Sequence, residues 1–411
     1  MRTFFLSLSV SFLFGLVACK DLGTLSDQQR VPPRPLTATE QALVTADNSF
    51  GFKLFAAVNN TEANKSVFIS PVSVSMALGM TLNGANGATR DSMVRTLEFA
   101  GMSQADINAS YKSLIALLTG LDPTVKFQIA NSIWHRPELN VEQPFKDVNK
   151  ENFNAEVNSL DFSDPNAANT INAWVDRSTN GKIKEIVPKP IPSEIVMYLI
   201  NAIYFKGTWT QRFDASVTRD DFFTLPNGSR TACKMMYQKA TLSHLSNNEL
   251  QGVDLPYGDA GFSMTIFLPK AGTNIDDFAG RLTQQYWSSL SSSFVNGEGE
   301  LYFPKFKLEY EKTLNDMLKA MGMTIAFSKT EADFTNIDKR GQLYISEVKH
   351  KTFVQVDEEG TEAAAVTSVG VGITSVGPNF VMRVDRPFIF VIRENHSGTI
   401  LFIGKIVEPK F

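Results

Sequence analysis

The feature that most constrains the fold is an uninterrupted stretch of globular sequence from residue 40 to residue 411. It contains no linker-like segment and no repeat at a fixed period, so it predicts one unusually large domain. Hydrophobic residues make up 43% of the chain and charged residues 20%. This composition provides for a large core and excludes wholesale disorder.

The overall charge is close to neutral, because 39 Lys and Arg residues stand against 43 Asp and Glu residues, a net charge of −4. Such a balance argues against a basic nucleic-acid binder, and we expect no nucleic-acid partner. The four histidines lack metal-ligand spacing, and the chain has no HExxH, CxxC, P-loop or GxSxG motif. We therefore expect no metal, no cofactor and no enzymatic activity.

The N-terminus has the pattern of a targeting segment. Arg2 precedes an almost wholly apolar run that ends at Ala18 and is shorter than the roughly 20 residues that a membrane-spanning helix needs. The run predicts a signal peptide over residues 1–18. Leu16-Val17-Ala18-Cys19 resembles the lipobox of bacterial lipoproteins, which implies that Cys19 is lipidated. The alternative is a buried or accidental cysteine.

Residues 19–39 are polar and include Pro32-Pro33-Arg34-Pro35, a composition that favours a flexible, extended tether. If Cys19 carries lipid, Cys233 has no partner for an intrachain disulfide. We expect a monomer anchored through Cys19 to the membrane of the cell envelope, at the outer membrane or the cell surface and facing the extracellular space.

Hydrophobic periodicity predicts both helices and strands. The predicted helices are 48–59, 72–83, 169–177 and 311–321. The predicted strands are 196–205, 262–268, 301–308, 349–356, 388–393 and 399–407. Because the strands cluster towards the C-terminus, the pattern indicates an α+β rather than an alternating α/β fold.

An uncharged segment from Ala363 to Met382 is the most informative part of the chain. Every second residue from Thr361 onward is small or β-branched, which suits a buried strand face. Gly370 and Gly372 weaken it as a permanent strand, because glycine packs little and costs backbone entropy. Two interpretations remain: an ordinary glycine-rich edge strand, or an exposed segment that becomes a strand on entering a sheet.

A family resemblance favours the second interpretation. Asp357-Glu358-Glu359-Gly360-Thr361-Glu362-Ala363-Ala364-Ala365 resembles the hinge of the serpin reactive loop. Other serpin-like motifs are Phe68-Ile69-Ser70-Pro71-Val72-Ser73, Thr179-Asn180-Gly181-Lys182-Ile183, Leu199-Ile200-Asn201-Ala202, Arg386-Pro387-Phe388 and Phe402-Ile403-Gly404-Lys405. The resemblance implies a single domain over residues 40–411, with three β-sheets, eight or nine helices and an exposed reactive loop at about 358–382.

The resemblance also implies a function. A target protease would attack the loop and form a covalent acyl-enzyme, and the cut loop would then enter the central sheet as a strand. Glu358 to Ala365 would form the hinge of this movement. Thr361, Ala363 and Ala365 fit an inhibitory serpin, because no charge or bulk on the inward face opposes burial. The alternatives are a non-inhibitory serpin that acts as a binding or chaperone-like surface, and an unrecognised enzyme.

The position of the reactive bond is implied by counting along the loop. Fourteen residues beyond Gly360 lies Thr374, which gives a Thr374-Ser375 bond; counting back from Pro387 points to Val376, and Ile373 is a third candidate. No Lys or Arg lies between Ala363 and Met382, which disfavours a trypsin-like target. We expect elastase-like or subtilisin-like serine proteases as targets, with papain-like cysteine proteases as an alternative.

Further residues carry the conformational change according to the same resemblance. Ser70, Ser73, Asn201 and His350 would form the polar shutter cluster beneath the central sheet, although a single histidine is otherwise a satisfied core residue. Trp209 would lie in the breach, where insertion begins, and plain core packing is its alternative.

Overall fold

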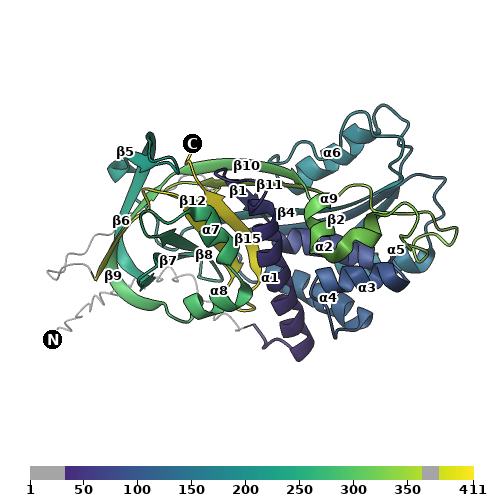
Figure 1. The fold of residues 1–411 in the computed structure, drawn as a ribbon, viewed down its shortest axis with the longest axis horizontal. Helices are drawn as coiled ribbons and strands as arrows, with labels where there is room; N and C mark the ends of the chain where they lie inside the picture. The colour runs from purple at the N-terminus through teal and green to yellow at the C-terminus, as the bar shows by residue number, and fades with distance from the viewer. Residues whose placement is uncertain (1–32, 363–378) are drawn as a thin grey trace, which may run out of the picture. The chain divides into compact units, whose positions relative to one another are not determined.

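Six strands form the sheet that carries the candidate site (Figure 1). The computed structural model describes residues 33–362 and 379–411, and those from Pro35 onward form one compact unit. The strand order of this sheet is β10-β11-β12-β4-β2-β3. In chain order the strands are β2 (Lys126–His135), β3 (Ala155–Ser159), β4 (Met197–Thr208), β10 (Phe306–Thr313), β11 (Lys349–Val356) and β12 (Gly360–Thr361).

A second, nine-stranded sheet follows the order β1-β15-β14-β8-β7-β6-β9-β13, with β5 paired to β6. Its strands are β1 (Val67–Ile69), β5 (Arg219–Thr224), β6 (Arg230–Ser246), β7 (Leu250–Tyr257), β8 (Phe262–Pro269), β9 (Val295–Pro304), β13 (Phe380–Arg383), β14 (Phe388–Glu394) and β15 (Ile400–Ile406). The strand β6 pairs with β5, β9 and β7 along its length. Because β6 is shared in this way, the described strands join into two continuous sheets instead of three separate ones.

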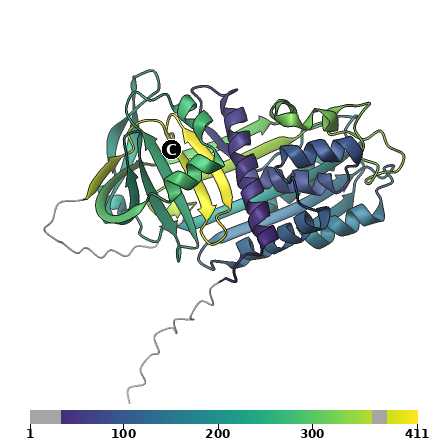
Figure 2. The ribbon, with the colours of Figure 1, turned by 60° about the horizontal axis from the view of Figure 1, so that its bottom comes forward.

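The helices of the described part of the chain are α1 (Ala38–Asn59), α2 (Pro71–Leu82), α3 (Gly87–Thr96), α4 (Gln104–Gly120), α5 (Gln143–Phe153), α6 (Ala167–Ser178), α7 (Ile275–Arg281), α8 (Gln284–Ser291) and α9 (Asn315–Leu318). α1 packs against α2 and α4 on one side and against α7 and β15 on the other (Figure 2). In Figure 1, α6 lies on one face of β2 and β4, with α2 on the opposite face. In residues 33–362 and 379–411, no helix has both the length and the apolar character needed to cross a bilayer.

Most of the predicted elements are confirmed, including α2, α6, β4, β8, β11, β14 and β15. The helix predicted over 311–321 is wrong in its first part. Residues up to Thr313 belong to β10, where Phe306 and Tyr310 are buried and all eight residues pair with β11. The α-helix itself covers only Asn315–Leu318. The α+β class predicted from the sequence is confirmed.

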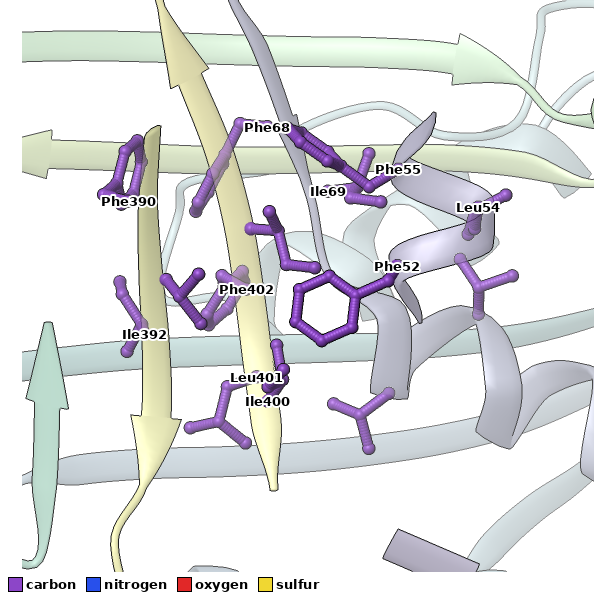
Figure 3. Close-up of a cluster of buried hydrophobic side chains, with 14 of the residues drawn as sticks. Phe52, Leu54, Phe55, Phe68, Ile69, Phe390, Ile392, Ile400, Leu401 and Phe402 are labelled. Carbon is purple, nitrogen blue, oxygen red and sulfur yellow. The ribbon is translucent and has the colours of Figure 1, made fainter. Parts of the chain in front are cut away.

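Aromatic packing holds the nine-stranded sheet against α1 (Figure 3). The ring of Phe68 on β1 stacks on Phe390 of β14 and on Phe402 of β15, with centroid distances of 5.5 and 5.1 Å. Phe52 and Phe55 of α1 are buried in the same cluster. Gly404 is required here, because a Cβ at that position would lie 2.2 Å from the Phe390 ring. This core fixes the strands that lie behind the candidate site.

Candidate functional site at the seam of the six-stranded sheet

The two-residue strand β12 lies between the long strands β4 and β11. Thr361 pairs with Val356 of β11 and with Gly207 of β4, and Gly360 pairs with Thr208. One more hydrogen bond, from the Glu362 amide to the Gln355 carbonyl, extends the β11 side. Among the described residues, no other strand pairing joins β4 to β11. We call the boundary between these two strands the seam. β12 occupies only the end of the seam that is formed by the C-terminal residues of β4 and β11.

The backbone conformation of β12 explains why the predicted hinge has a glycine at position 360. Gly360 has a φ of 152°, a value that residues with a side chain rarely adopt. A Cβ on Gly360 would lie 2.1 Å from the carbonyl oxygen of Gly207. Only glycine therefore allows the chain to pass this close to β4 and to begin a strand there.

The family resemblance assigned Trp209 to the breach and Thr361 to the hinge, both of which take part in loop insertion. In the structure both residues contact Tyr257. The Thr361 hydroxyl lies 2.6 Å from the Tyr257 hydroxyl, and both side chains are buried. The indole of Trp209 stacks on the Tyr257 ring at 4.4 Å and donates from Nε1 to the Asp357 carbonyl. Tyr257 was not predicted from the sequence, because it is separated from Thr361 by 104 residues and belongs to an ordinary-looking strand.

Three acidic residues of the hinge form ion pairs with three separate parts of the chain. Glu358 lies 2.8 Å from the Lys305 ammonium, Glu359 lies 2.8 Å from the Arg212 guanidinium, and Glu362 lies 3.6 Å from the Lys182 ammonium. Burial opposes ionisation of Glu358, but Lys305 and the Thr218 hydroxyl outweigh it and lower the pKa of its carboxyl. The hinge is thus held by charge pairs on both sides of the seam.

The predicted shutter residues lie further along the seam. The Ser70 amide donates to Nε2 of His350 at 3.0 Å, and the Ser70 hydroxyl donates to the Leu401 carbonyl. Burial lowers the pKa of His350 to about 4, so the ring is neutral near pH 7 and its Nδ1 carries the proton. Asn201 donates to Asn131 of β2, at 2.8 Å. No direct hydrogen bond joins His350 to Asn201 or Ser73 within the described residues.

A cavity of about 210 Å³ brings Ser73, Asn201 and His350 together. Its walls come from α2, the end of α6, β4 and residues 342–351. Two polar atoms of lining residues are buried without a hydrogen-bond partner in the described structure, the Tyr198 hydroxyl and Oδ1 of Asn201. Unpaired buried polar atoms are unfavourable, so the seam has unmet hydrogen-bonding capacity on its β4 side.

Several predicted site residues fall outside the described part of the chain. These are Cys19, the hinge residues Ala363, Ala364 and Ala365, and the reactive-bond candidates Ile373, Thr374, Ser375 and Val376. In residues 33–362 and 379–411, no group of three or more His, Cys, Asp or Glu side chains could hold a metal ion.

Comparisons with known proteins identify the family of this chain. A family model described as "Serpin (serine protease inhibitor)" matches residues 45–409. Human serpin B11 is 32% identical over 391 residues, covering 90% of this chain and all of that protein. The leukocyte elastase inhibitor of Xenopus laevis is 34% identical over 381 residues, covering 89% of this chain and 99% of that protein. The native structure of the thermophilic serpin tengpin matches with a TM-score of 0.83 and 32% identity, covering 92% and 96% of the two chains.

The described residues define the class first: an α+β protein in which the two-residue strand β12 lies between two long strands of the six-stranded sheet. The chain belongs to the serpin family, and it has the serpin fold. Members of this family are protease inhibitors and not enzymes.

Proposed function

We propose that this serpin is an irreversible suicide-substrate inhibitor of proteases. The protease forms an acyl-enzyme with the reactive loop, and the cut loop then enters the seam as a full strand and carries the attached enzyme with it. The observation that carries the proposal is β12, a strand begun between β4 and β11 and not continued among the described residues.

The registers at β12 support this mechanism. Continuing both pairings six residues beyond Thr361 places position 367 opposite His350 of β11 and opposite Asn201 of β4. Position 367 is Thr367, on the face that alternation from Thr361 directs inward. An inserted strand would thereby bring a hydroxyl to the level of the Asn201 Oδ1, which lacks a hydrogen-bond partner. In this proposal the polar side chains of the shutter cluster form hydrogen bonds with the inserted strand.

The target class follows from the loop sequence. The segment around Thr374-Ser375, with Ile373 and Val376 as alternatives, is uncharged and small or β-branched. It suits elastase-like or subtilisin-like serine proteases, and an apolar residue before the bond also suits papain-like cysteine proteases. The name of the Xenopus laevis relative, leukocyte elastase inhibitor, supports the elastase-like choice.

The test is incubation of the protein, from Pro35 to Phe411, with elastase-like, subtilisin-like, papain-like and trypsin-like proteases. Denaturing gels would detect a covalent complex, and mass spectrometry would identify the released C-terminal peptide. We expect a complex with an elastase-like or subtilisin-like enzyme and a peptide that begins at Ser375. A complex with another peptide moves the reactive bond. Cleavage by every enzyme without a complex would instead favour the non-inhibitory serpin.

The N-terminal signal supports a second, separate proposal on location. We propose that Cys19 is lipidated in a bacterial host and that residues 19–39 tether the inhibitor to the cell envelope, at the outer membrane or cell surface. The test is mass spectrometry of the N-terminal peptide from native cells, with Cys19→Ser as the control. A wild-type protein released without lipid would contradict the anchor and leave the inhibitory mechanism untouched.

A further inference from the structure

The turn that follows α6 is fastened to the outer face of the six-stranded sheet. Asn180 and Gly181 both have positive φ values, 49° and 79°, which reverse the chain sharply. The Asn180 side chain donates to Gln128 at 2.7 Å and accepts from the Lys126 ammonium at 2.9 Å. Both partners belong to β2, the strand beside β4. The next residue of this turn is Lys182, whose backbone position is therefore fixed relative to the sheet.

The side chain of Lys182 reaches across the seam. Its ammonium lies 4.8 Å from the centre of the Phe353 ring on β11 and 3.6 Å from Oε2 of Glu362. The same Glu362 carboxylate interacts with the hydroxyl of Tyr204 on β4, which favours its ionised form. One ion pair thus contacts both strands that must separate to admit a new strand between them.

Glu362 directly follows β12 and is the last described residue before position 379. Its φ of 57° lies in the left-handed region, which is unfavourable for a residue with a side chain. Its side chain is only 4% exposed. Burial raises the pKa of its carboxyl, an effect opposed by Lys182, Tyr204 and Lys206. The buried carboxylate therefore depends on Lys182, the cation with which it forms its ion pair, while the backbone is held in a turn that a strand cannot contain.

The pairing registers show what this ion pair obstructs. Continuing β12 three residues beyond Thr361 places position 364 opposite Phe353 of β11 and opposite Tyr204 of β4. Those are the two residues that Lys182 and Glu362 now contact. A strand cannot be extended past Thr361 until Glu362 adopts an extended backbone, and that change moves its carboxylate away from its present contacts.

We propose that the Lys182–Glu362 ion pair is a latch that holds the seam closed below β12 and limits the rate of loop insertion. The inference rests on the proposed inhibitory function. The turn after α6 would then influence the fraction of cut loops that insert before the acyl-enzyme is hydrolysed and the protease is released.

The experiment compares Lys182→Met, Glu362→Gln, the double variant and Lys182→Arg with wild type. Insertion without protease is followed at a fixed, mildly elevated temperature, as the first-order loss of protein able to form a covalent complex. We expect each single variant to insert about tenfold faster, the effect of losing one interaction of about 1.4 kcal/mol. The double variant should match the singles, because both changes remove the same contact. Lys182→Arg should stay close to wild type, since it keeps the charge.

The matched control is Lys184→Met, an exposed lysine two residues further along the same turn. Single variants that insert no faster than Lys184→Met would overturn the latch while leaving the inhibitory function in place. A wild-type protein that forms no covalent complex and gains no heat stability after loop cleavage would overturn the inhibitory function, and the latch would fall with it. The two failures are therefore distinguishable in one set of measurements.

Discussion

At the scale of single residues, two buried titratable groups give this serpin opposing dependences of stability on pH. Asp47 on α1 accepts hydrogen bonds from the Ser75 and Tyr111 hydroxyls through Oδ1, while its Oδ2 has no hydrogen-bond partner in the described structure. Burial, opposed by these two hydrogen bonds, raises the pKa of Asp47 from 3.8 to about 7. Burial also lowers the pKa of His350 from 6.5 to about 4. Lowering the pH therefore raises the contribution of Asp47 to stability and reduces that of His350.

Asp47→Asn tests the first group. The folded state binds the Asp47 proton more tightly than the unfolded state does, so stability is lost as the pH rises from about 4 to about 7. Above that window the buried charge costs about 4 kcal/mol, three units at 1.36 kcal/mol each. We expect Asp47→Asn to raise the melting temperature at pH 8 and to change it little at pH 5, measured by scanning calorimetry. A lower melting temperature at pH 8 would contradict this prediction.

His350→Gln tests the second group, since glutamine offers an acceptor oxygen to the Ser70 amide in place of Nε2. Below pH 6.5 the unfolded state binds the histidine proton more readily, so stability falls from pH 6.5 to about 4. The full loss amounts to about 3 kcal/mol. We expect the melting temperature of the variant to fall less than that of wild type when the pH is lowered from 6.5 to 4.5. His396→Gln, between β14 and β15, is the control; an equal change in both variants would refute a specific role for His350.

At the scale of elements, hydrophobic patterns in the sequence predicted those helices and strands that depend mainly on local interactions. The apolar run of β8 is buried at all eight positions, and its strand was predicted from the sequence to within one residue. The start of α1 at Ala38 was missed, although the capping box of Thr37 and Glu40 was a readable signal. The strand predicted over 301–308 is divided at Lys305 between β9 and β10. The family resemblance placed Trp209 and Thr361 in one apparatus, but Tyr257, Asn131 and Lys182 join the site through contacts between distant parts of the chain, which periodicity does not encode.

The inward-facing residue of β12 gives the element-scale prediction. Thr361 is buried against Tyr257, and arginine there would have to lose its hydration for a strand to form. We expect Thr361→Arg to form at least about tenfold less covalent complex than wild type, because slower insertion lets water hydrolyse the acyl-enzyme. The measurement is the ratio of complex to cleaved protein on denaturing gels. Thr361→Ser keeps the hydroxyl and should inhibit normally; a Thr361→Arg variant that inhibits equally well would rule out insertion at β12.

At the scale of the whole molecule, the seam leaves pairing capacity of β4 and β11 unused among the described residues. In the uncut state, the seam has a cavity of about 210 Å³ and two buried polar atoms without hydrogen-bond partners in the described structure. β4 spans twelve residues and β11 eight, yet β12 pairs with only two and one of them respectively. An inserted strand would complete both ladders, and each new hydrogen bond contributes about 1 kcal/mol net.

Loop cleavage should therefore stabilise this serpin. About ten new ladder hydrogen bonds give a gain on the order of 10 kcal/mol, which corresponds to a rise in melting temperature of about 10 °C or more for a domain of this size. Scanning calorimetry before and after cleavage with a protease that forms no complex measures the rise. Thr361→Arg, cut by the same protease, is the control and should gain much less, because burying the arginine opposes strand insertion. Equal melting temperatures for cut and uncut wild type would mean that no strand enters the seam after cleavage. The edges of β4 and β11 that are unpaired among the described residues would then need another explanation.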